Sequence, residues 1–119
     1  MLEATTINSN DENMRKHFRL TYPPQERPVF TMKSGHKFKI QDCSEGGLCI
    51  ITQDNFPWKQ VSGDLCFNKR HKIKVRGRLI RREGNLVIIK LMNHIDYSVI
   101  MAEQRFLLQN YKEFLRASS

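Results

Sequence analysis

Residues 72–92, KIKVRGRLIRREGNLVIIKLM, carry the clearest structural signal in the sequence. In residues 72–79 apolar residues or glycine alternate with lysine and arginine, the pattern of a β-strand with one buried and one solvent-facing side. Residues 86–92 are mostly apolar, and residues 81–85, which end in Glu-Gly-Asn, are typical of a tight turn. This stretch therefore predicts a long β-hairpin.

Similar short patterns occur upstream of this hairpin. We expect strands at residues 20–22, 29–32, 38–40, 48–51 and 64–67. They are separated by turn sequences such as Ser34-Gly35-His36 and Glu45-Gly46-Gly47. Several short strands at this spacing predict an all-β domain, either a small antiparallel barrel or a sandwich.

The end of the sequence changes to helical spacing. An apolar stripe predicts a helix over about residues 98–116, formed by Ile100, Leu107, Leu108, Tyr111, Phe114 and Leu115. Glu103 and Gln104 are predicted to lie toward other faces of this helix. A helix with such a stripe has to bury it, so we expect the helix to pack against the barrel.

Length and composition limit the class of protein. The 119 residues suit one domain, and 39% hydrophobic with 27% charged residues argue against wholesale disorder. No apolar run reaches the roughly 20 residues of a membrane-spanning helix, and the polar first residues do not resemble a secretory signal. Three scattered cysteines argue against a disulfide scaffold. We therefore expect a soluble domain in the cytoplasm.

The formal net charge of +8 is concentrated in residues 69–82, which hold eight basic residues and no acidic one. One interpretation is a solvated strand face that discourages edge pairing, and a second is a face that also draws anions toward a nearby site. A small RNA-binding barrel is a further alternative. It would favour aromatic residues among the basic ones, and none lies on this strand.

Metal binding and nucleophilic catalysis have little support in the sequence. The histidines and cysteines show no C-x-x-C or H-x-x-x-H spacing, so no structural metal or cofactor is predicted. Cys43 and Ser44 have only distant possible partners in His36 and His71, without a recognised nucleophile motif. The sequence therefore predicts a protein that is not an enzyme.

Two short motifs together point to a nucleotide site. Arg15 and Arg19 are four residues apart, and guanidinium groups bind phosphates through paired hydrogen bonds and stack on purines. Asp42, Ser44 and Gly47 follow about two dozen residues later. A carboxylate accepts hydrogen bonds from the N1–H and amine of guanine, a serine hydroxyl adds a contact, and glycine permits close backbone approach. This combination predicts a guanine-nucleotide site without metal.

Asp42 is expected to point toward the mouth of the barrel. Its position has the same parity as Phe38 and Ile40, which are the predicted inward-facing residues of this strand. Either motif alone is common in turns and surface segments, and it is their combination that favours a binding site.

These motifs resemble those of the PilZ domain, the bacterial receptor module for cyclic di-GMP. Its two signatures, R-x-x-x-R and [D/N]-x-S-x-x-G, match Arg15-Lys16-His17-Phe18-Arg19 and Asp42-Cys43-Ser44-Glu45-Gly46-Gly47. Lys39 to Ile50, Gly63 to Leu65, Val75 to Leu79 and Leu86 to Leu91 follow in the order of the family's strands. The resemblance covers roughly residues 15–116.

The resemblance implies a six-stranded antiparallel β-barrel with a C-terminal α-helix. The polar composition of the first residues predicts a flexible tail at 1–14, and the resemblance implies a PilZ domain at 15–119, with the barrel at about 18–93. By this analogy Arg15 and Arg19 bind the phosphates of cyclic di-GMP and stack on guanine, while Asp42, Ser44 and Gly47 hold a guanine edge. The family's domains are not catalytic, and ligand binding reorders the arginine segment.

The resemblance leaves the number of ligands and the partner open. Members that bind two stacked ligands carry an arginine just before the first motif arginine, and here that residue is Met14, which favours one ligand per domain. The expected function is a cytoplasmic receptor that signals to a protein client, such as motility, adhesion or polysaccharide export machinery. The alternatives are an adaptor of the same fold that acts without ligand and the small basic RNA-binding barrel.

Overall fold

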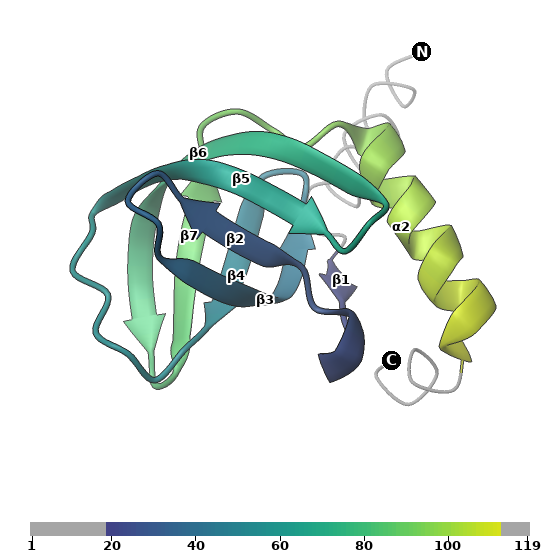
Figure 1. Ribbon diagram of the computed structural model, residues 1–119, viewed down its shortest axis with the longest axis horizontal. Coiled ribbons are helices and arrows are strands. Elements are labelled where there is room, and N and C mark those ends of the chain that lie inside the picture. Colours follow the sequence, from purple (N-terminus) through teal and green to yellow (C-terminus); the bar gives the residue numbers. More distant parts are fainter. Residues whose placement is uncertain (1–18, 113–119) are drawn as a thin grey trace, which may run out of the picture.

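The computed structural model describes residues 19–112. Its elements are seven strands, a short 3₁₀ helix and one α-helix (Figure 1). They are β1 (Leu20–Thr21), η1 (Pro24–Glu26), β2 (Val29–Met32), β3 (Lys37–Ser44), β4 (Gly47–Ile51), β5 (Gln60–Phe67), β6 (His71–Glu83), β7 (Leu86–Leu91) and α2 (Tyr97–Asn110). The predicted tail at 1–14 lies outside the described residues.

Six of the strands close into an antiparallel barrel. Strands β2, β3 and β4 pair in chain order, as do β5, β6 and β7, so the barrel consists of two three-stranded meanders. Two seams join the meanders, one between β2 and β5 and the other between β4 and β7. In Figure 1 β2 and β5 lie in front, and the fainter β4 and β7 lie behind them. The predicted barrel is therefore confirmed and the sandwich alternative is not.

Strand β1 is a seventh strand, which pairs only with β3 and is not one of the six strands that close the barrel. It pairs with the second half of β3, while β2 pairs with the first half, so both strands use the same edge of β3. Pro23 and Pro24 divide the two, because proline provides no backbone N–H for the ladder and its ring favours the turn of η1. The segment between β1 and β2, which contains η1, is flanked by hydrogen bonds from Tyr22 N to Gln41 O and from Ile40 N to Pro28 O.

The alternation read from the sequence places one side of each strand in a continuous core. On β6, Val75 is buried while its neighbours Lys74 and Arg76 are exposed. Large apolar side chains fill the interior, among them Phe30, Ile40, Ile50, Leu65, Phe67 and Ile89. Filled interiors of this kind are usual in small barrels, so ligand-binding residues are expected on the outside.

Helix α2 begins with a capping interaction. The Asp96 carboxylate accepts hydrogen bonds from the Ser98 backbone N–H at 2.9 Å and the Ser98 hydroxyl at 2.8 Å, and these bonds hold the pKa of Asp96 below its usual value. The helix ends at Asn110, and Tyr111 caps it by donating its N–H to Leu107 O. Residues 113–116 of the predicted helix, with Phe114 and Leu115, lie outside the described residues.

The helix buries a different set of residues from the predicted stripe. Ile100 and Leu107 are buried as expected, but Leu108 is 47% exposed and Glu103 is fully buried. The prediction that Glu103 lies toward an outer face is therefore wrong. A carboxylate in this position requires compensation, since burying an unpaired charge is costly.

Glu103 is compensated from two separate parts of the barrel. The Tyr22 hydroxyl, just after β1, donates to Glu103 Oε1 at 2.8 Å. Arg70, in the turn between β5 and β6, donates from Nε to Oε2 at 2.7 Å and from Nη2 to Oε1 at 2.9 Å, a two-bond pairing of guanidinium and carboxylate. The guanidinium also lies 3.8 Å from the ring centre of Phe106. These contacts attach α2 to one end of the barrel.

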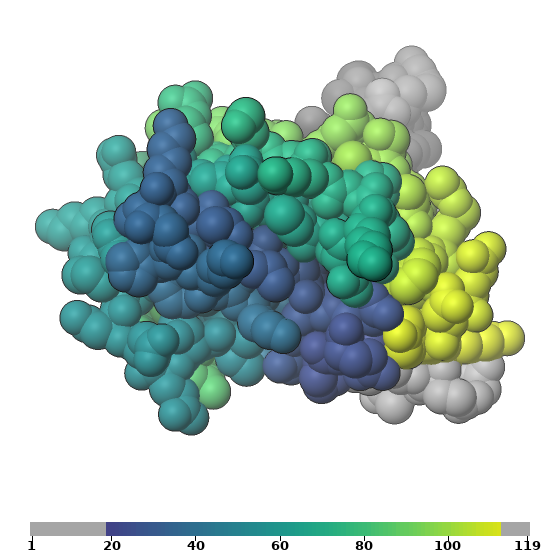
Figure 2. Space-filling model, viewed as in Figure 1, coloured from purple at the N-terminus to yellow at the C-terminus, as the bar shows by residue number. Residues whose placement is uncertain are grey.

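A second carboxylate, Glu26 of η1, extends the same network. It accepts hydrogen bonds from the Tyr111 hydroxyl at 2.6 Å, from Asn68 at 2.7 Å and from Arg70 Nη1 at 3.2 Å. In Figure 2 the yellow end of α2 accordingly lies against the purple segment that contains η1. The hydrogen bond from Tyr111 is the main reason that the pKa of Glu26 is lowered.

Strands β2 and β5 approach closely at Gly63. A Cβ atom built on Gly63 would lie 2.0 Å from Thr31 O and 2.8 Å from Met32 Cα. Both atoms belong to the backbone, so only a shift of one strand against the other relieves the clash. Glycine is thus required at this seam for a steric reason.

We expect Gly63→Ala to destabilise the protein by about 2 kcal/mol or more, because the new methyl group meets backbone atoms. Gly46→Ala is the control, since a Cβ there would be 3.7 Å from His94, an ordinary contact. The measurement is urea unfolding of both variants. Equal stability of Gly63→Ala and wild type would contradict the close approach of β2 and β5.

Glu103→Gln is expected to lower the free energy of unfolding by about 3 kcal/mol, because it leaves the Arg70 guanidinium beside a neutral amide. The matched control is Arg105→Gln on the exposed side of the same helix, expected to change stability by less than about 0.5 kcal/mol. Chemical unfolding at neutral pH measures both. If the two variants are equally stable, Glu103 does not anchor α2.

Tyr111→Phe is expected to change the pH dependence of stability. The folded-state pKa of Glu26 lies below its ordinary value of 4.5, so its ionised form contributes stability above that value. This contribution is lost as the pH falls through the folded-state pKa. The variant should therefore be less stable than wild type near pH 7, and the difference should shrink near pH 3. A difference that is the same at both pH values would refute this role of Tyr111.

Candidate functional site

Ser44 and Gly47 lie opposite each other at the start of the β3–β4 hairpin. Glu45 and Gly46 form the two-residue connection between them. The carbonyl of Glu45 accepts a hydrogen bond from Ile95 N at 2.8 Å, and that of Gly46 accepts one from Leu91 N at 2.9 Å. The segment from the end of β7 to α2 therefore holds this turn in place.

Gly47 leaves the surface beside this turn without a projecting side chain. A Cβ atom at this position would lie 3.3 Å from Ile89 O and 3.8 Å from the Ser44 hydroxyl oxygen. A larger side chain would crowd the neighbouring strand β7. Ser44 itself is only 6% exposed, so it is nearly buried beside Gly47.

Asp42 does not point into the barrel as its parity predicted. The β3–β4 register shifts between Ile40 and Asp42, which marks a β-bulge. After the bulge it is Cys43, fully buried, that continues the inward face of Phe38 and Ile40. Asp42 is instead opposite Cys49 on one side and Thr21 on the other, on the outer face of the barrel. The predicted position at the barrel mouth is therefore wrong.

Arg19 contacts Asp42 directly. Arg19 Nη1 donates to Asp42 Oδ1 at 3.0 Å, with 57% of the arginine side chain and 13% of the aspartate side chain exposed. The pairing of β1 with β3 explains the contact, because Thr21 is opposite Asp42 and Arg19 lies two residues before it. Alternate residues of a strand share a face. The sequence had predicted separate ligand contacts for these residues and missed that they pair.

Among the predicted site residues, the structure brings Arg19 into contact with Asp42, and it places Ser44 of β3 opposite Gly47 of β4. Arg15 lies outside the described residues. The bulge had one weak signal in the sequence, since strict alternation of apolar and polar residues stops at Gln41-Asp42-Cys43-Ser44. The Thr21–Asp42 register had none, because Pro23 and Pro24 obscure the path from β1 to β2.

The thiols near this region are poorly suited to nucleophilic chemistry. Burial raises the pKa of Cys49 to about 11, and the carboxylate of Asp42 adds to this effect while Arg19 opposes it. Burial also raises the pKa of Cys43, with a further contribution from Asp42. Both thiols therefore stay protonated at neutral pH, when only a thiolate is a strong nucleophile.

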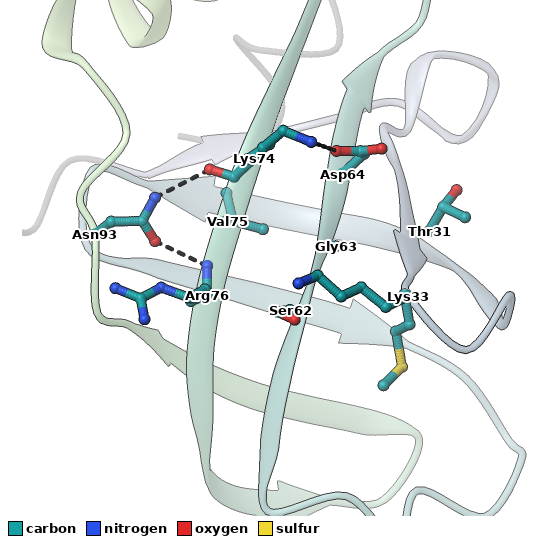
Figure 3. A pocket seen from close by; sticks show the side chains of 10 residues that line it. Thr31, Lys33, Ser62, Gly63, Asp64, Lys74, Val75, Arg76 and Asn93 are labelled. Carbon is teal, nitrogen blue, oxygen red and sulfur yellow. Dashed lines mark hydrogen bonds and ion pairs between the residues drawn. The ribbon is translucent and has the colours of Figure 1, made fainter.

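A second surface feature is a hollow on strands other than those of the β3–β4 turn. This hollow of about 300 Å³ lies over β2, β5 and β6 (Figure 3). Lys74 pairs with Asp64 at 3.6 Å, and Asn93 joins β6 through Arg76 N and Lys74 O. Lys72 also approaches Asp64, at 4.0 Å. The hollow contains none of the predicted site residues, and part of the basic strand is neutralised there.

Residues 19–112 contain neither a candidate metal site nor a membrane-spanning helix. No three histidine, cysteine or acidic side chains gather there in a way that could hold a metal ion. No helix in this part of the chain is long and apolar enough to span a membrane.

Comparison with known proteins agrees with the fold. An uncharacterized Legionella protein of known crystal structure superposes with a TM-score of 0.61 and 16% sequence identity, covering 81% of this chain and 99% of that one. This likeness shows the fold alone. No curated protein matches the sequence significantly.

The sequence also matches the profile of the PilZ domain over residues 13–109. This range includes both motifs, the barrel and nearly all of α2. PilZ domains are receptor modules for cyclic di-GMP and are binding domains, not enzymes. Because the match covers most of the 119 residues, this protein belongs to the PilZ domain family.

Proposed function

We propose that this protein binds cyclic di-GMP through Arg15, Arg19, Asp42, Ser44 and Gly47, without a metal or cofactor. The observation that carries the proposal is the contact between Arg19 and Asp42 at 3.0 Å. It joins two motifs that are 23 residues apart in sequence, so a ligand at one motif reaches the other. Family membership supports the choice of ligand.

The chemistry of these residues suits the two parts of the ligand. The guanidinium groups of Arg15 and Arg19 bind phosphodiester oxygens through paired hydrogen bonds and stack on guanine. The Asp42 carboxylate accepts hydrogen bonds from the N1–H and amine of guanine. Ser44 adds a hydroxyl contact, and Gly47 allows the base to approach the β4 backbone.

The Arg19–Asp42 ion pair suggests how binding changes the protein. Arg19 is more than half exposed, and surface pairs of this kind contribute only about 0–1 kcal/mol. The ligand offers a better partner to each member, phosphate to Arg19 and guanine to Asp42. Binding then exchanges this ion pair for ligand contacts and reorders the arginine segment.

The reordered segment is the signal in this proposal. A protein client reads it, and motility, adhesion or polysaccharide export machinery are candidate clients. Because cyclic di-GMP is a second messenger inside bacteria, the proposal includes a cytoplasmic location. The proposal also includes one bound ligand per domain, because Met14 stands where members that bind two ligands carry an arginine.

Isothermal titration with cyclic di-GMP tests this function. We expect micromolar or tighter binding, and a loss of about tenfold to a hundredfold in Arg15→Ala, Arg19→Ala and Asp42→Ala, equivalent to about 1.4–2.7 kcal/mol. Asp42→Asn should lose less, since its amide oxygen remains an acceptor. Arg105→Ala, which removes an exposed arginine from α2, is the control and should bind like wild type.

The same titration separates the alternatives. A ligand-independent adaptor would give no heat with cyclic di-GMP. An RNA-binding barrel would bind a short RNA with steep salt dependence, and Arg19→Ala would not weaken that binding. Either result, or wild-type affinity in all three site variants, would refute the proposal.

A further inference from the structure

The row of residues that contains Ser44 and Gly47 continues onto two more strands. Across the β4–β7 seam Gly47 is opposite Lys90, and on β6 Lys90 is opposite Arg78. Directly opposed residues of antiparallel strands have their side chains on the same face. Ser44, Gly47, Lys90 and Arg78 therefore form one line across four neighbouring strands.

This line lies on the outer face of the barrel. The neighbours of Lys90 along β7, Ile89 and Leu91, are 1% and 3% exposed and belong to the core, whereas Lys90 is exposed. Arg78 is exposed in the same way. Alternation along a strand then directs both charged side chains to the side of the barrel that also carries Asp42.

Lys90 and Arg78 differ from three other basic residues of this sheet, Lys72, Lys74 and Arg81, which form ion pairs. Lys72 and Lys74 share Asp64, and Arg81 pairs with Glu83. No ion pair within residues 19–112 includes Lys90 or Arg78. Two like charges directly opposite each other destabilise a sheet, and an anion between them would remove the repulsion.

The distance to the proposed site is short. Neighbouring strands are about 4.8 Å apart, so β7 is one strand spacing from Gly47 and β6 is two. Gly47 has no side chain to separate the Ser44 side of the line from Lys90. A lysine side chain extends over several ångströms, and a ligand held at Asp42 and Ser44 would therefore extend toward Lys90.

We propose that Lys90 and Arg78 extend the nucleotide site and bind a phosphodiester group of the ligand. This inference rests on the proposed function and deepens it, because it assigns the positive charge on this side of Gly47 to the same ligand. A compact dianion with two phosphodiesters then contacts cationic groups at both ends of the site, Arg19 at one end and Lys90 with Arg78 at the other. Lys90 and Arg78 thereby favour such a ligand over a nucleotide with a single small anionic group.

Titration of matched variants with cyclic di-GMP tests the inference. Lys90→Gln and Arg78→Gln should each raise Kd about three- to tenfold, the effect of an exposed charge contact, and the double variant should lose more. Lys90→Arg keeps the charge and should retain most of the affinity. The control is Lys74→Gln, an equal charge change on β6 beside Asp64, which should leave Kd unchanged.

Unfolding without ligand gives a second measurement. At about 0.01 M salt, where charges act over about 30 Å, Arg78→Gln should melt at a higher temperature than wild type because the repulsion from Lys90 is gone. At about 1 M salt, where the range is about 3 Å, the difference should disappear.

The outcomes are distinguishable. If wild type binds cyclic di-GMP and both Lys90→Gln and Arg78→Gln bind equally well, this inference is wrong and the proposed function stands. If Lys74→Gln weakens binding as much as Lys90→Gln, the effect is general electrostatics and the inference is also wrong. If wild type does not bind, the proposed function fails and this inference fails with it.

Discussion

The buried carboxylate of Glu103 is the constraint on which the arrangement of this protein depends. A charge with no exposed surface is tolerated only when it is paired and hydrogen-bonded, and here Tyr22 and Arg70 meet that requirement. These two residues come from the end of β1 and from the β5–β6 turn, so one side chain of α2 specifies how three distant segments meet. A leucine at this position would pack against the barrel, but it would make no hydrogen bonds that fix the orientation of the helix.

The position of Arg19 follows from the same constraint. Tyr22 is three residues after Arg19, and its hydrogen bond to Glu103 fixes the end of the short strand β1. With only two residues in this strand, pairing to β3 alone would be a weak restraint. The contact between Arg19 and Asp42 thus depends on the helix at the end of the barrel, as well as on the register of β1.

The parts that could be predicted are those that depend on neighbours in sequence. The alternation in residues 72–79 predicted the long strand of the barrel correctly, because burial of one sheet face repeats every two residues. The bulge between Ile40 and Asp42 turns Asp42 to the outer face and Cys43 to the inner one. The residue types alone do not determine where such a register shift occurs. Glu103 was placed on the wrong side of its helix, since its partners Tyr22 and Arg70 are 81 and 33 residues away. Whether a polar side chain is buried depends on its hydrogen-bonding partners, and only the fold brings those partners close to it.

The construction from two meanders also has a consequence for how the protein forms. Within each meander, strands that are adjacent in sequence pair through short connections, and such local contacts form early in folding. The β4–β7 seam joins segments about forty residues apart, so its closure carries a larger loop entropy and comes later. Gly47 and Lys90 face each other across this seam. A ligand that touches both residues, as we propose, is therefore bound only by a chain that has completed its barrel, and a newly made or partly unfolded chain does not bind it.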